Sequence, residues 1–556
     1  MVNQRIVLPK RPENGQQGSL AGRGQHKDIE TLAPEKLARK GGEIMLDVRS
    51  ALCRAMVCNR NRPAILAEDF ELTFEEAWKR GCQLANALLS IGLKSGDKIA
   101  VLEDNCLEAS DFFLAAAIGN FVRVPLYRRN SAEAHAHMIG HTDCRAIIVA
   151  SEYAHEVAQF KDTLDHLEHV IIRSDDYESW LAEQSDADPD IAIDIDDPHL
   201  IRHSGGTTGR SKGMQFSHRQ WMRTCRDWSF FLPRIEAGDY GTHVGPISHG
   251  SGYLFMPIWL AGGCNVLVRR FDPEAFADML EQFGGFTFAV PTMLSDMVAQ
   301  GTRKRDFTKL RGIMVSGAPI RPATALQARD FFGNVLYQLY GQTESVPVAG
   351  MSPREWFSEV EGSEPLLSVG KIMPYSAIEI RDENNQPLPP GEIGEIALQC
   401  EGQITEIMNE PELTRQRLVD GWVLSGDIGK IDENGYVYLT DRKDDMIISG
   451  GFNIWPTELE NVISSLKGVR EVAVVAAPHE RWGEVPVAVV VLKDGAQVSE
   501  DDIVEACKVQ LGSYKRPGRV IVREEPLPRT PVGKIQRKSI RDQFWNNPSG
   551  RKISGA

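Results

Sequence analysis

The stretch Ser204-Gly-Gly-Thr-Thr-Gly-Arg-Ser-Lys-Gly213 suggests a loop that binds phosphate groups. Glycine lets backbone N–H groups approach an anion closely, hydroxyl groups add donors, and Lys212 supplies a charge that can reach terminal phosphates. The P-loop of most nucleoside triphosphatases has glycine before the lysine and serine or threonine after it, whereas Ser211 and Gly213 flank this one. A different phosphate-binding loop is therefore predicted, and a flexible turn between two strands is the alternative.

The sequence on both sides of this loop alternates between apolar strands and amphipathic helices, which is typical of an α/β fold with a largely parallel sheet. Thr73 and Glu76 predict a capping box at a helix start, and Gly92 predicts the end of that helix. We expect strands at 98–102, 121–126, 145–150, 262–270, 286–290 and 311–317, and helices at 44–56, 111–119 and 273–283.

The pattern of predicted secondary structure alternates through two α/β units, one on each side of the loop, and then changes twice. Short β-rich segments follow Val369 and predict a small β-subdomain. After Asp441 a helix at 456–466, strands at 471–475 and 487–492, a helix at 500–511 and a strand at 519–522 predict a small α+β domain. The predicted organisation is a disordered extension (1–40), an N-terminal domain of two α/β units and a β-subdomain (41–441), a mobile C-terminal lid (442–545) and a tail (546–556).

Composition narrows the class of protein. The net charge of −15 over 556 residues argues against general binding of nucleic acid or anionic membranes. Residues 502–556 nevertheless hold 12 Lys/Arg against 5 Asp/Glu, which suits a polyanionic small molecule or a solvated basic face. The nine cysteines are scattered without a CxxC pair, and no apolar run is long enough to span a membrane. We expect reduced thiols, neither disulfides nor zinc, no transmembrane segment and a cytoplasmic location.

Four further motifs carry possible chemistry, each with a plain structural alternative. Tyr340-Gly-Gln-Thr-Glu344 ends a strand with a carboxylate suited to Mg²⁺, or with a solvated glutamate in a turn. Asp427, after Ser-Gly, could accept both hydroxyls of a ribose or form an Asx turn. The charged run 441–445 with Gly450-Gly451 could bring backbone close to a ligand or form a solvated linker, and Lys534 could face a reacting anion or solvent.

Together with the loop, these motifs resemble the adenylate-forming superfamily, which contains acyl- and aryl-CoA synthetases, peptide-synthetase adenylation domains and firefly luciferase. The five motifs occur in the same order and with similar spacing, and the resemblance extends from about residue 45 to 540. It implies an enzyme that activates a carboxylic acid with ATP. Attack of the carboxylate on the α-phosphorus gives an acyl-adenylate and pyrophosphate, and a thiol then displaces AMP.

The resemblance also implies roles for individual residues. Residues implied to bind ATP are Ser204, Gly205, Gly206, Thr207, Thr208, Gly209, Lys212 and Thr343 at the phosphates, Gly317, Ala318, Pro319, Tyr340 and Gly341 at the adenine, and Asp427 and Arg442 at the ribose. Glu344 is the implied Mg²⁺ ligand, Lys534 the catalytic lysine that bridges carboxylate and α-phosphate, and Asp444 the hinge. Residues implied to meet CoA are Gly450, Gly451, Trp482 and Arg516.

The acyl pocket and the thiol acceptor are less sharply defined. The resemblance places His249 at a gate and Tyr253, Val290, Met293 and Ser316 around the acid. These side chains include no cation for a second carboxylate, so we expect a hydrophobic fatty or aromatic monocarboxylate. CoA is the expected acceptor; transfer to a carrier protein, luciferase-like oxidation and a silent ATP-binding homologue are the alternatives, and a homodimer is compatible with each.

Overall fold

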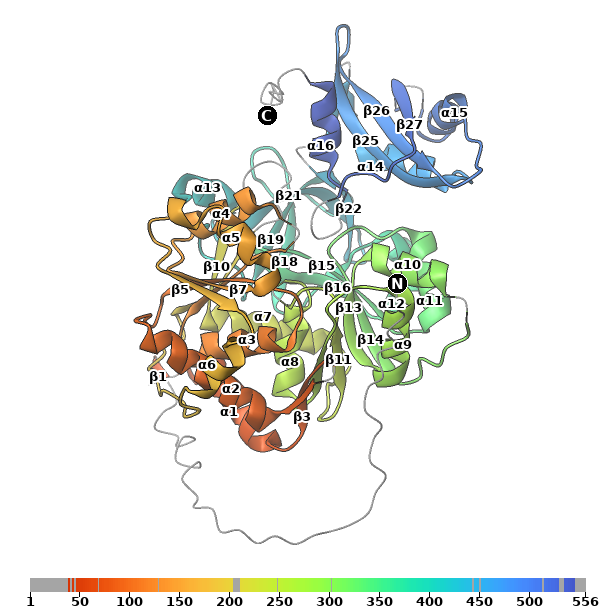
Figure 1. Ribbon diagram of the computed structural model, residues 1–556. Coiled ribbons are helices and arrows are strands. Elements are labelled where there is room, and N and C mark those ends of the chain that lie inside the picture. Colours follow the sequence, from red (N-terminus) through yellow and green to blue (C-terminus); the bar gives the residue numbers. More distant parts are fainter. Residues whose placement is uncertain are drawn as a thin grey trace.

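A computed structural model describes residues 39–40, 43–44, 47–68, 70–128, 130–203, 211–247, 249–301, 303–442, 445–449, 452–512, 515–529 and 535–545. A large N-terminal domain carries a small C-terminal domain, drawn in blue in Figure 1, above one end. The extension predicted at 1–40 lies outside the described residues except for Arg39–Lys40 (β1), which pair antiparallel with Glu43–Ile44 (β2).

The first sheet confirms the predicted parallel α/β unit. Its strand order is β10-β9-β6-β5-β7-β8, and only the β9–β10 pair is antiparallel. Alternate residues face opposite sides, so Ile99 and Val101 join one apolar cluster while Ala100 and Leu102 join another. The strands are β5 (Lys98–Leu102), β6 (Val122–Pro125), β7 (Ala146–Ala150), β8 (His169–Arg173), β9 (Pro198–His203) and β10 (Gly213–Ser217).

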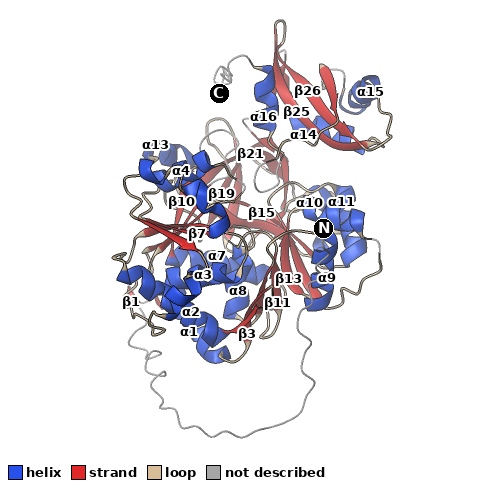
Figure 2. Ribbon diagram, viewed as in Figure 1, coloured by secondary structure: helices blue, strands red, loops and turns tan. Residues whose placement is uncertain are grey.

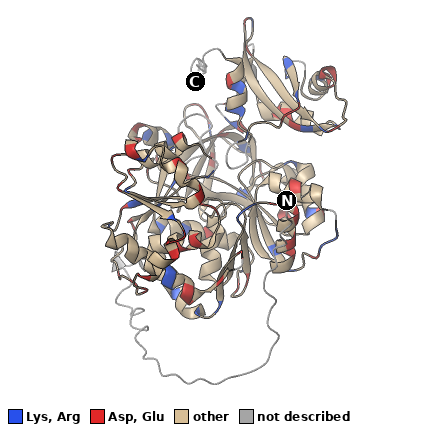
Figure 3. Cartoon of the chain, in the orientation of Figure 1, with Lys and Arg blue, Asp and Glu red and all other residues tan. Residues whose placement is uncertain are grey.

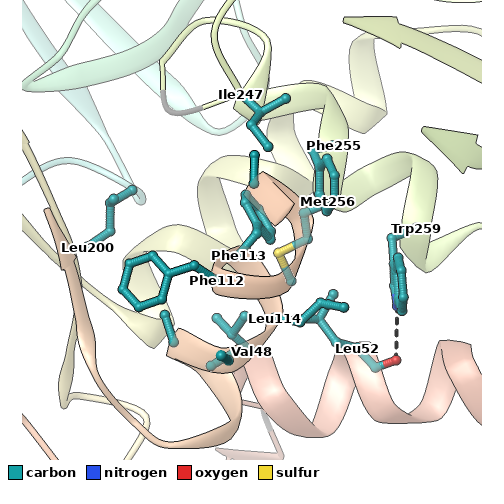
Figure 4. Close-up of a cluster of buried hydrophobic side chains, with 14 of the residues drawn as sticks. Val48, Leu52, Phe112, Phe113, Leu114, Leu200, Ile247, Phe255, Met256 and Trp259 are labelled. Carbon is teal, nitrogen blue, oxygen red and sulfur yellow. Dashed lines mark hydrogen bonds between the residues drawn. The ribbon is translucent and has the colours of Figure 1, made fainter. Parts of the chain in front are cut away.

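Helices cover both faces of this sheet, as Figure 2 shows in blue against red strands. One side packs against α1 (Val48–Asn59), α2 (Phe74–Ser90), α3 (Leu107–Ile118), α7 (His218–Phe231) and α8 (Gly252–Leu260). The other side packs against α4 (Ala132–His141) and α5 (Ala154–Val157). Figure 4 shows the centre of the first cluster, where Phe113 and Phe255 pack together and the Trp259 indole N–H donates to the Leu52 carbonyl at 3.1 Å.

Helix caps explain where the predicted helix bounds hold and where they are wrong. The Thr73 hydroxyl accepts the Glu76 N–H at 3.3 Å while the Glu76 carboxylate accepts the Thr73 N–H at 2.8 Å, which confirms the capping box. The helix predicted from residue 44 begins at Val48, because Asp47 caps it by accepting the Ser50 N–H at 2.9 Å. The helix predicted from 111 begins at Leu107, because Asp111 lies inside it, paired with Arg80.

A second sheet forms the other half of the N-terminal domain. Its strand order is β18-β19-β21-β22-β17-β16-β15-β14-β13-β11-β12-β3-β4, with β20 beside β21. The parallel part contains β3 (Pro63–Ala67), β11 (Tyr240–His243), β12 (Cys264–Leu267), β13 (Gly285–Ala289), β14 (Leu310–Val315) and β15 (Leu336–Gln342). It packs against α9 (Pro273–Phe283), α10 (Pro291–Gln300) and α11 (Pro322–Phe332), and β4 (Phe70–Thr73) closes its edge. The strand predicted at 262–270 is present as β12, which is shorter and covers only Cys264–Leu267.

The β-rich segment predicted after Val369 is present and has its own apolar cluster, which includes Ile378, Ile396 and Val437. Its strands do not form a detached sheet, because β16 pairs with β17 and β17 with β22. Its elements are β16 (Ser345–Met351), β17 (Gly370–Ile372), β18 (Ser376–Arg381), β19 (Gly394–Cys400), β20 (Leu418–Val419), β21 (Trp422–Ile431) and β22 (Tyr436–Arg442). The short helix α13 (Pro411–Arg417) contacts β20 and β21, whereas α6 (Tyr177–Ala182) and α12 (Pro353–Trp356) lie elsewhere in the N-terminal domain.

The C-terminal domain has the predicted α+β architecture. Its sheet has the order β24-β23-β26-β25, with β27 parallel to β26. The elements are β23 (Ile447–Ser449), β24 (Phe452–Ile454), α14 (Pro456–Ser465), β25 (Val469–His479), β26 (Gly483–Leu492), α15 (Glu500–Leu511), β27 (Arg519–Arg523) and α16 (Arg537–Arg541). No helix in the described part of the chain is long and apolar enough to cross a membrane.

Candidate active site

The carboxyl ends of three parallel strands bring the predicted nucleotide-binding segments together. The Ser316 N–H, just after β14, donates to the Ala289 carbonyl of β13 at 3.4 Å, and β14 pairs with β15 at Val315 and Gln338. Residues 316–319, Val290 and the Tyr340 turn therefore share one edge of the sheet. This is the edge at which open α/β sheets bind ligands.

Two glycines at this edge are required by the backbone. Gly317 has φ +87°, a conformation that side chains rarely adopt. Gly341 lies where the β15–β16 register shifts, and a Cβ there would come within 2.7 Å of the Val346 side chain and 2.9 Å of the Ser345 carbonyl. The close turn after Tyr340 thus needs glycine.

Asp427 is the centre of a buried hydrogen-bond cluster. It is 5% exposed in β21, and its Oδ2 accepts from the Tyr340 hydroxyl at 2.6 Å and from Gln342 Nε2 at 2.7 Å. Arg442 Nε lies 2.5 Å from its other oxygen, Oδ1. Three of the five sequence motifs contribute to this cluster. The Asx-turn alternative for Asp427 is wrong, because these side-chain partners come from distant parts of the chain.

The electrostatics of this cluster keep Tyr340 a hydrogen-bond donor. Burial, followed by the neighbouring Asp427 carboxylate, raises the pKa of the Tyr340 phenol well above its usual value of 10. Gln342 was not singled out by the sequence analysis, although it lies inside the Tyr-Gly-x-Thr-Glu motif. Its amide holds two groups of β21, donating to the Asp427 carboxylate and, at 2.8 Å, to the Ser425 carbonyl.

Glu344 lies at the turn between β15 and β16, beside half-buried Thr343. It is only 9% exposed, so the alternative of a solvated glutamate is wrong. Arg417, which the sequence analysis also missed, approaches its Oε1 at 3.5 Å and donates to the Ser425 carbonyl at 3.3 Å. No cluster of three or more metal-ligating His, Cys, Asp or Glu side chains occurs among the described residues. One carboxylate fits Mg²⁺ bound together with substrate phosphates rather than in a protein cage.

The ends of the glycine-rich loop are held close together. His203 at the end of β9 pairs with Gly213 at the start of β10, and half-buried Lys212 directly precedes that strand. The predicted contacts of Ser204, Gly205, Gly206, Thr207, Thr208 and Gly209 lie outside the described residues. The loop does connect two strands, as the alternative interpretation also requires.

The predicted acyl-pocket residues come from two neighbouring regions. Tyr253 in α8 is buried against Trp228, with ring centroids 4.6 Å apart, while Val290, Met293 and Ser316 surround the ends of β13 and β14. A Cβ at Gly250, next to His249, would come within 2.8 Å of Phe288 in β13, so the two regions touch.

A cation that the sequence-based expectation did not include lies beside Tyr253, one of these predicted residues. The Arg202 guanidinium stands 4.0 Å from the centre of the Tyr253 ring, and its Nη2 donates to the His249 carbonyl at 3.0 Å. The sequence pattern did not indicate this contact because Arg202 is distant from Tyr253 along the chain.

In the C-terminal domain, the residues predicted to meet CoA lie at one end of the sheet. Trp482, 45% exposed, directly precedes β26, and Arg516 precedes β27, which runs parallel to β26. Ser449 pairs with Gly483, so the flanks of Gly450 and Gly451 lie at that same end. Asp444, Gly450, Gly451 and Lys534 themselves lie outside the described residues.

Much of the basic tail is paired with carboxylates, and Figure 3 shows that the C-terminal domain carries acidic as well as basic segments. Lys508, Lys515, Arg529, Arg537 and Arg541 form ion pairs with Glu505, Glu458, Glu471, Glu460 and Asp445, respectively. The local excess of positive charge is therefore a weaker argument for a polyanionic ligand than the sequence suggested.

Asp441 joins the two domains. This carboxylate lies next to the last residue of β22. It accepts the Thr457 N–H, in the first turn of α14, at 2.8 Å and the Arg442 N–H at 2.8 Å. Burial raises its pKa to about 6, against the opposing effect of Arg537.

Comparison with known proteins agrees with this geometry. The AMP-binding enzyme family model matches residues 54–404, and the AMP-binding enzyme C-terminal domain matches 458–534. The fatty acid–[acyl-carrier-protein] ligase ScoC of Streptomyces coeruleorubidus is 32% identical over 510 residues, 88% of this chain and 95% of the relative. A feruloyl-CoA synthase of Amycolatopsis sp is 31% identical over 477 residues, which cover 85% of this chain and 94% of that relative. The solved structure of ATP-bound MatB from Rhodopseudomonas palustris has a TM-score of 0.82 at 26% identity, covering 90% of this chain and 99% of MatB.

Proposed function

Because the chain belongs to the AMP-binding enzyme family, we propose that it is an ATP-dependent ligase that joins a carboxylic acid to CoA through an acyl-adenylate. The observation that carries the proposal is the Asp427 cluster. Tyr340 and Gln342 hold one carboxylate oxygen in place, and the carboxylate lies at the same sheet edge as Gly317 and Glu344. We assign Asp427 and Arg442 to the ribose, residues 317–319 with Tyr340 to the adenine, and Lys212 with Thr343 to the phosphates.

In the first step, a carboxylate oxygen of the acid attacks the α-phosphorus of ATP. An oxygen–phosphorus bond forms, the α–β bridging bond breaks, and its electron pair leaves with pyrophosphate. We assign Lys534 to the α-phosphate and the attacking carboxylate, where its charge offsets the negative charge of the transition state. Mg²⁺, held by Glu344 and substrate phosphates, would supply charge neutralisation on the leaving pyrophosphate.

In the second step, a thiolate attacks the carbonyl carbon of the acyl-adenylate and AMP leaves with the bonding electrons. Figure 1 shows the β25–β26 hairpin extending away from the N-terminal domain, so Trp482 in its turn is remote from the adenylation edge in this arrangement. By contrast, Arg529 forms a β-bridge with Ile535, the residue after Lys534, and lies near Asp296 of α10. Burial raises the pKa of Asp296, and the charge of Arg529 opposes that shift. A rotation at Asp444 would move the Lys534 side of the C-terminal domain away from the adenylation edge and bring the Trp482 side toward it.

For the acid we propose a body that is apolar, either fatty or aromatic, because Tyr253, Trp228 and Val290 bring apolar surface to the pocket. The expectation of a single carboxylate rested on the absence of a cation, and Arg202 removes that reason. CoA is the proposed acceptor because Trp482 and Arg516 lie at one end of the C-terminal sheet. A carrier protein is the second candidate, favoured by the similarity to ScoC. A cytoplasmic location and a homodimer complete the proposal.

The decisive experiment measures pyrophosphate and AMP release from ATP with a panel of carboxylic acids, with and without CoA. Pyrophosphate release that depends on the acid, and acyl-CoA with AMP that depend on both acid and CoA, are expected. Acid-dependent pyrophosphate without any acyl-CoA would favour a carrier protein. No acid-dependent pyrophosphate across the panel would refute the proposed function.

Lys534→Ala tests the assigned chemistry within that assay. It should abolish adenylation while sparing transfer from a supplied acyl-adenylate to CoA, and Lys508→Ala, which removes only an exposed ion pair with Glu505, should leave both steps unchanged. Equal loss of both steps in Lys534→Ala would contradict its role.

A further inference from the structure

Two arginine side chains are buried on one face of the first sheet. Arg123 in β6 and Arg202 in β9 are 3% and 1% exposed. The two strands are parallel neighbours in which Arg123 lies opposite Leu200. Since alternate residues of a strand share a face, Arg202 projects to the same side as Leu200 and Arg123. This side of the sheet packs against α3, α7 and α8.

Aromatic rings surround both guanidinium groups. Arg123 lies 4.1 Å from the centre of the Phe113 ring, and Arg202 lies 4.0 Å from that of Tyr253 and 4.9 Å from that of Trp221. Figure 4 shows Phe113, Leu200 and Ile247 as part of this apolar region. Such rings attract a cation, and the Tyr253 hydroxyl can also hydrogen-bond Arg202, but none of these side chains supplies a negative charge.

Neither arginine has a negative partner among the described residues. Within the described ranges no carboxylate forms an ion pair with them, and Nε and Nη2 of Arg123 and Nε and Nη1 of Arg202 have no acceptor. Other buried arginines differ: Arg305, whose side chain is 1% exposed, lies 3.0 Å from an Asp278 oxygen. Burial, and secondly the charge of Arg202, lowers the pKa of Arg123 to about 9. A buried charge is normally paired, whereas in the described part of the chain these two cations have no counter-charge.

We propose that Arg123 and Arg202 bind a second carboxylate of the acid substrate, so that the enzyme activates a dicarboxylic acid with an apolar or aromatic body. This inference rests on the proposed function and deepens it. Arg202 contacts both Tyr253 and the His249 carbonyl, which places it beside the predicted acyl pocket, and Arg123 lies on the same face of the neighbouring strand. A guanidinium matches a carboxylate in shape and can bind both oxygens at once. One carboxylate is adenylated, and the other neutralises the arginines.

Matched pairs of acids test this assignment in the full-length enzyme. Hexanoate is compared with adipate, and 3-phenylpropanoate with 3-(4-carboxyphenyl)propanoate, by acid-dependent pyrophosphate release. In the wild type the dicarboxylate of at least one pair should have a kcat/KM roughly tenfold or more above its partner, as expected for one charge-assisted contact. Arg202→Met and Arg123→Met should each reduce this ratio to about one or below. Arg329→Met, which removes an arginine paired with Asp330 on α11, should keep it.

Three results would overturn the inference while leaving the ligase function intact. The first is turnover of monocarboxylates at least as efficient as that of dicarboxylates in the wild type. The second is a ratio that neither arginine variant changes. The third is an equal loss with both members of each pair in the variants, which would mean that the arginines bind the reacting carboxylate itself.

Thermal unfolding keeps the inference testable without turnover. Dicarboxylates should raise the Tm of the wild type and not that of Arg202→Met, even if no acid is adenylated and the proposed function fails. Without acid, Arg202→Met should have an unchanged or higher Tm, because it removes an uncompensated buried charge. If the Tm of Arg202→Met is lower than that of the wild type by roughly 5 °C or more, and dicarboxylates do not shift the Tm of the wild type, the arginines serve structural packing alone.

Discussion

Asp427 and the pair Arg123–Arg202 are all buried charges, yet their surroundings are opposite. Asp427 receives hydrogen bonds from Tyr340 and Gln342 and lies beside Arg442, so its orientation is fixed before any ligand arrives. The two arginines face aromatic rings and lack a carboxylate among the described residues. A charge with built-in partners is a preorganised binding group, whereas a charge without them needs a ligand to complete it.

Asp427→Ala should have the largest effect on the partnered region. It removes the proposed acceptor for two ribose hydroxyls, and two charge-assisted hydrogen bonds at about 1.5–3 kcal/mol each predict a loss of about 1000-fold in kcat/KM for ATP. Acid-dependent pyrophosphate release measures this. Asp330→Ala, an exposed aspartate on α11, is the control. A loss below about tenfold would mean that Asp427 is structural and that the contrast with the arginines concerns stability only.

Asp441 is an intermediate case, a buried carboxylate whose hydrogen-bond partners are two backbone N–H groups. Its folded pKa of about 6 lies above the ordinary value of 3.8. Its protonated form therefore favours folding below about pH 4, and this contribution is lost as the pH rises through 6. Relative to Asp441→Asn, which does not titrate, the unfolding free energy of the wild type should fall by about 3 kcal/mol between pH 4 and 7. Urea unfolding at several pH values measures it, and a difference independent of pH would contradict the burial of this charge.

Tyr340→Phe should weaken the partnered cluster without dismantling it. The Asp427 carboxylate loses one donor but keeps Gln342, so the expected cost is about 1–2 kcal/mol in unfolding free energy and about a tenfold rise in the KM for ATP. Tyr375→Phe, in which a partly exposed ring packs on Arg226, controls for the loss of a phenol. If both variants behave like the wild type, the hydroxyl of Tyr340 does not orient Asp427.

Arg442→Gln should have the smallest effect, although Arg442 is close to the Asp427 carboxylate. The Arg442 side chain is 48% exposed, and ion pairs at such sites contribute about 0–1 kcal/mol. The KM for ATP should therefore rise about threefold at most, and the rise should shrink at high salt. A loss above about 30-fold would show that Arg442 contributes far more to ribose binding than an exposed ion pair can, and would contradict this prediction.

Local sequence predicted those elements whose ends carry their own signals. The helices at 273–283 and 500–511 have the predicted bounds because Asp272 and Ser499 cap them. Gly341 lies in the predicted turn because no side chain fits there. Two predicted helix starts were wrong. One helix is capped by Asp47, and in the other Asp111 is buried against Arg80; the local pattern did not distinguish either aspartate from a solvent-facing charge.

The sequence by itself determined the family resemblance, because the order of its glycine-rich, acidic and lysine motifs depends on backbone conformation and charge at single positions. Only the tertiary structure decided which charges meet. Gln342 and Asp427 come from different strands, and Arg123 and Arg202 lie in separate apolar stretches that become neighbours through the β6–β9 register. Side chains far apart in the chain are brought together by strand pairing, and burial then determines whether a charge needs a partner.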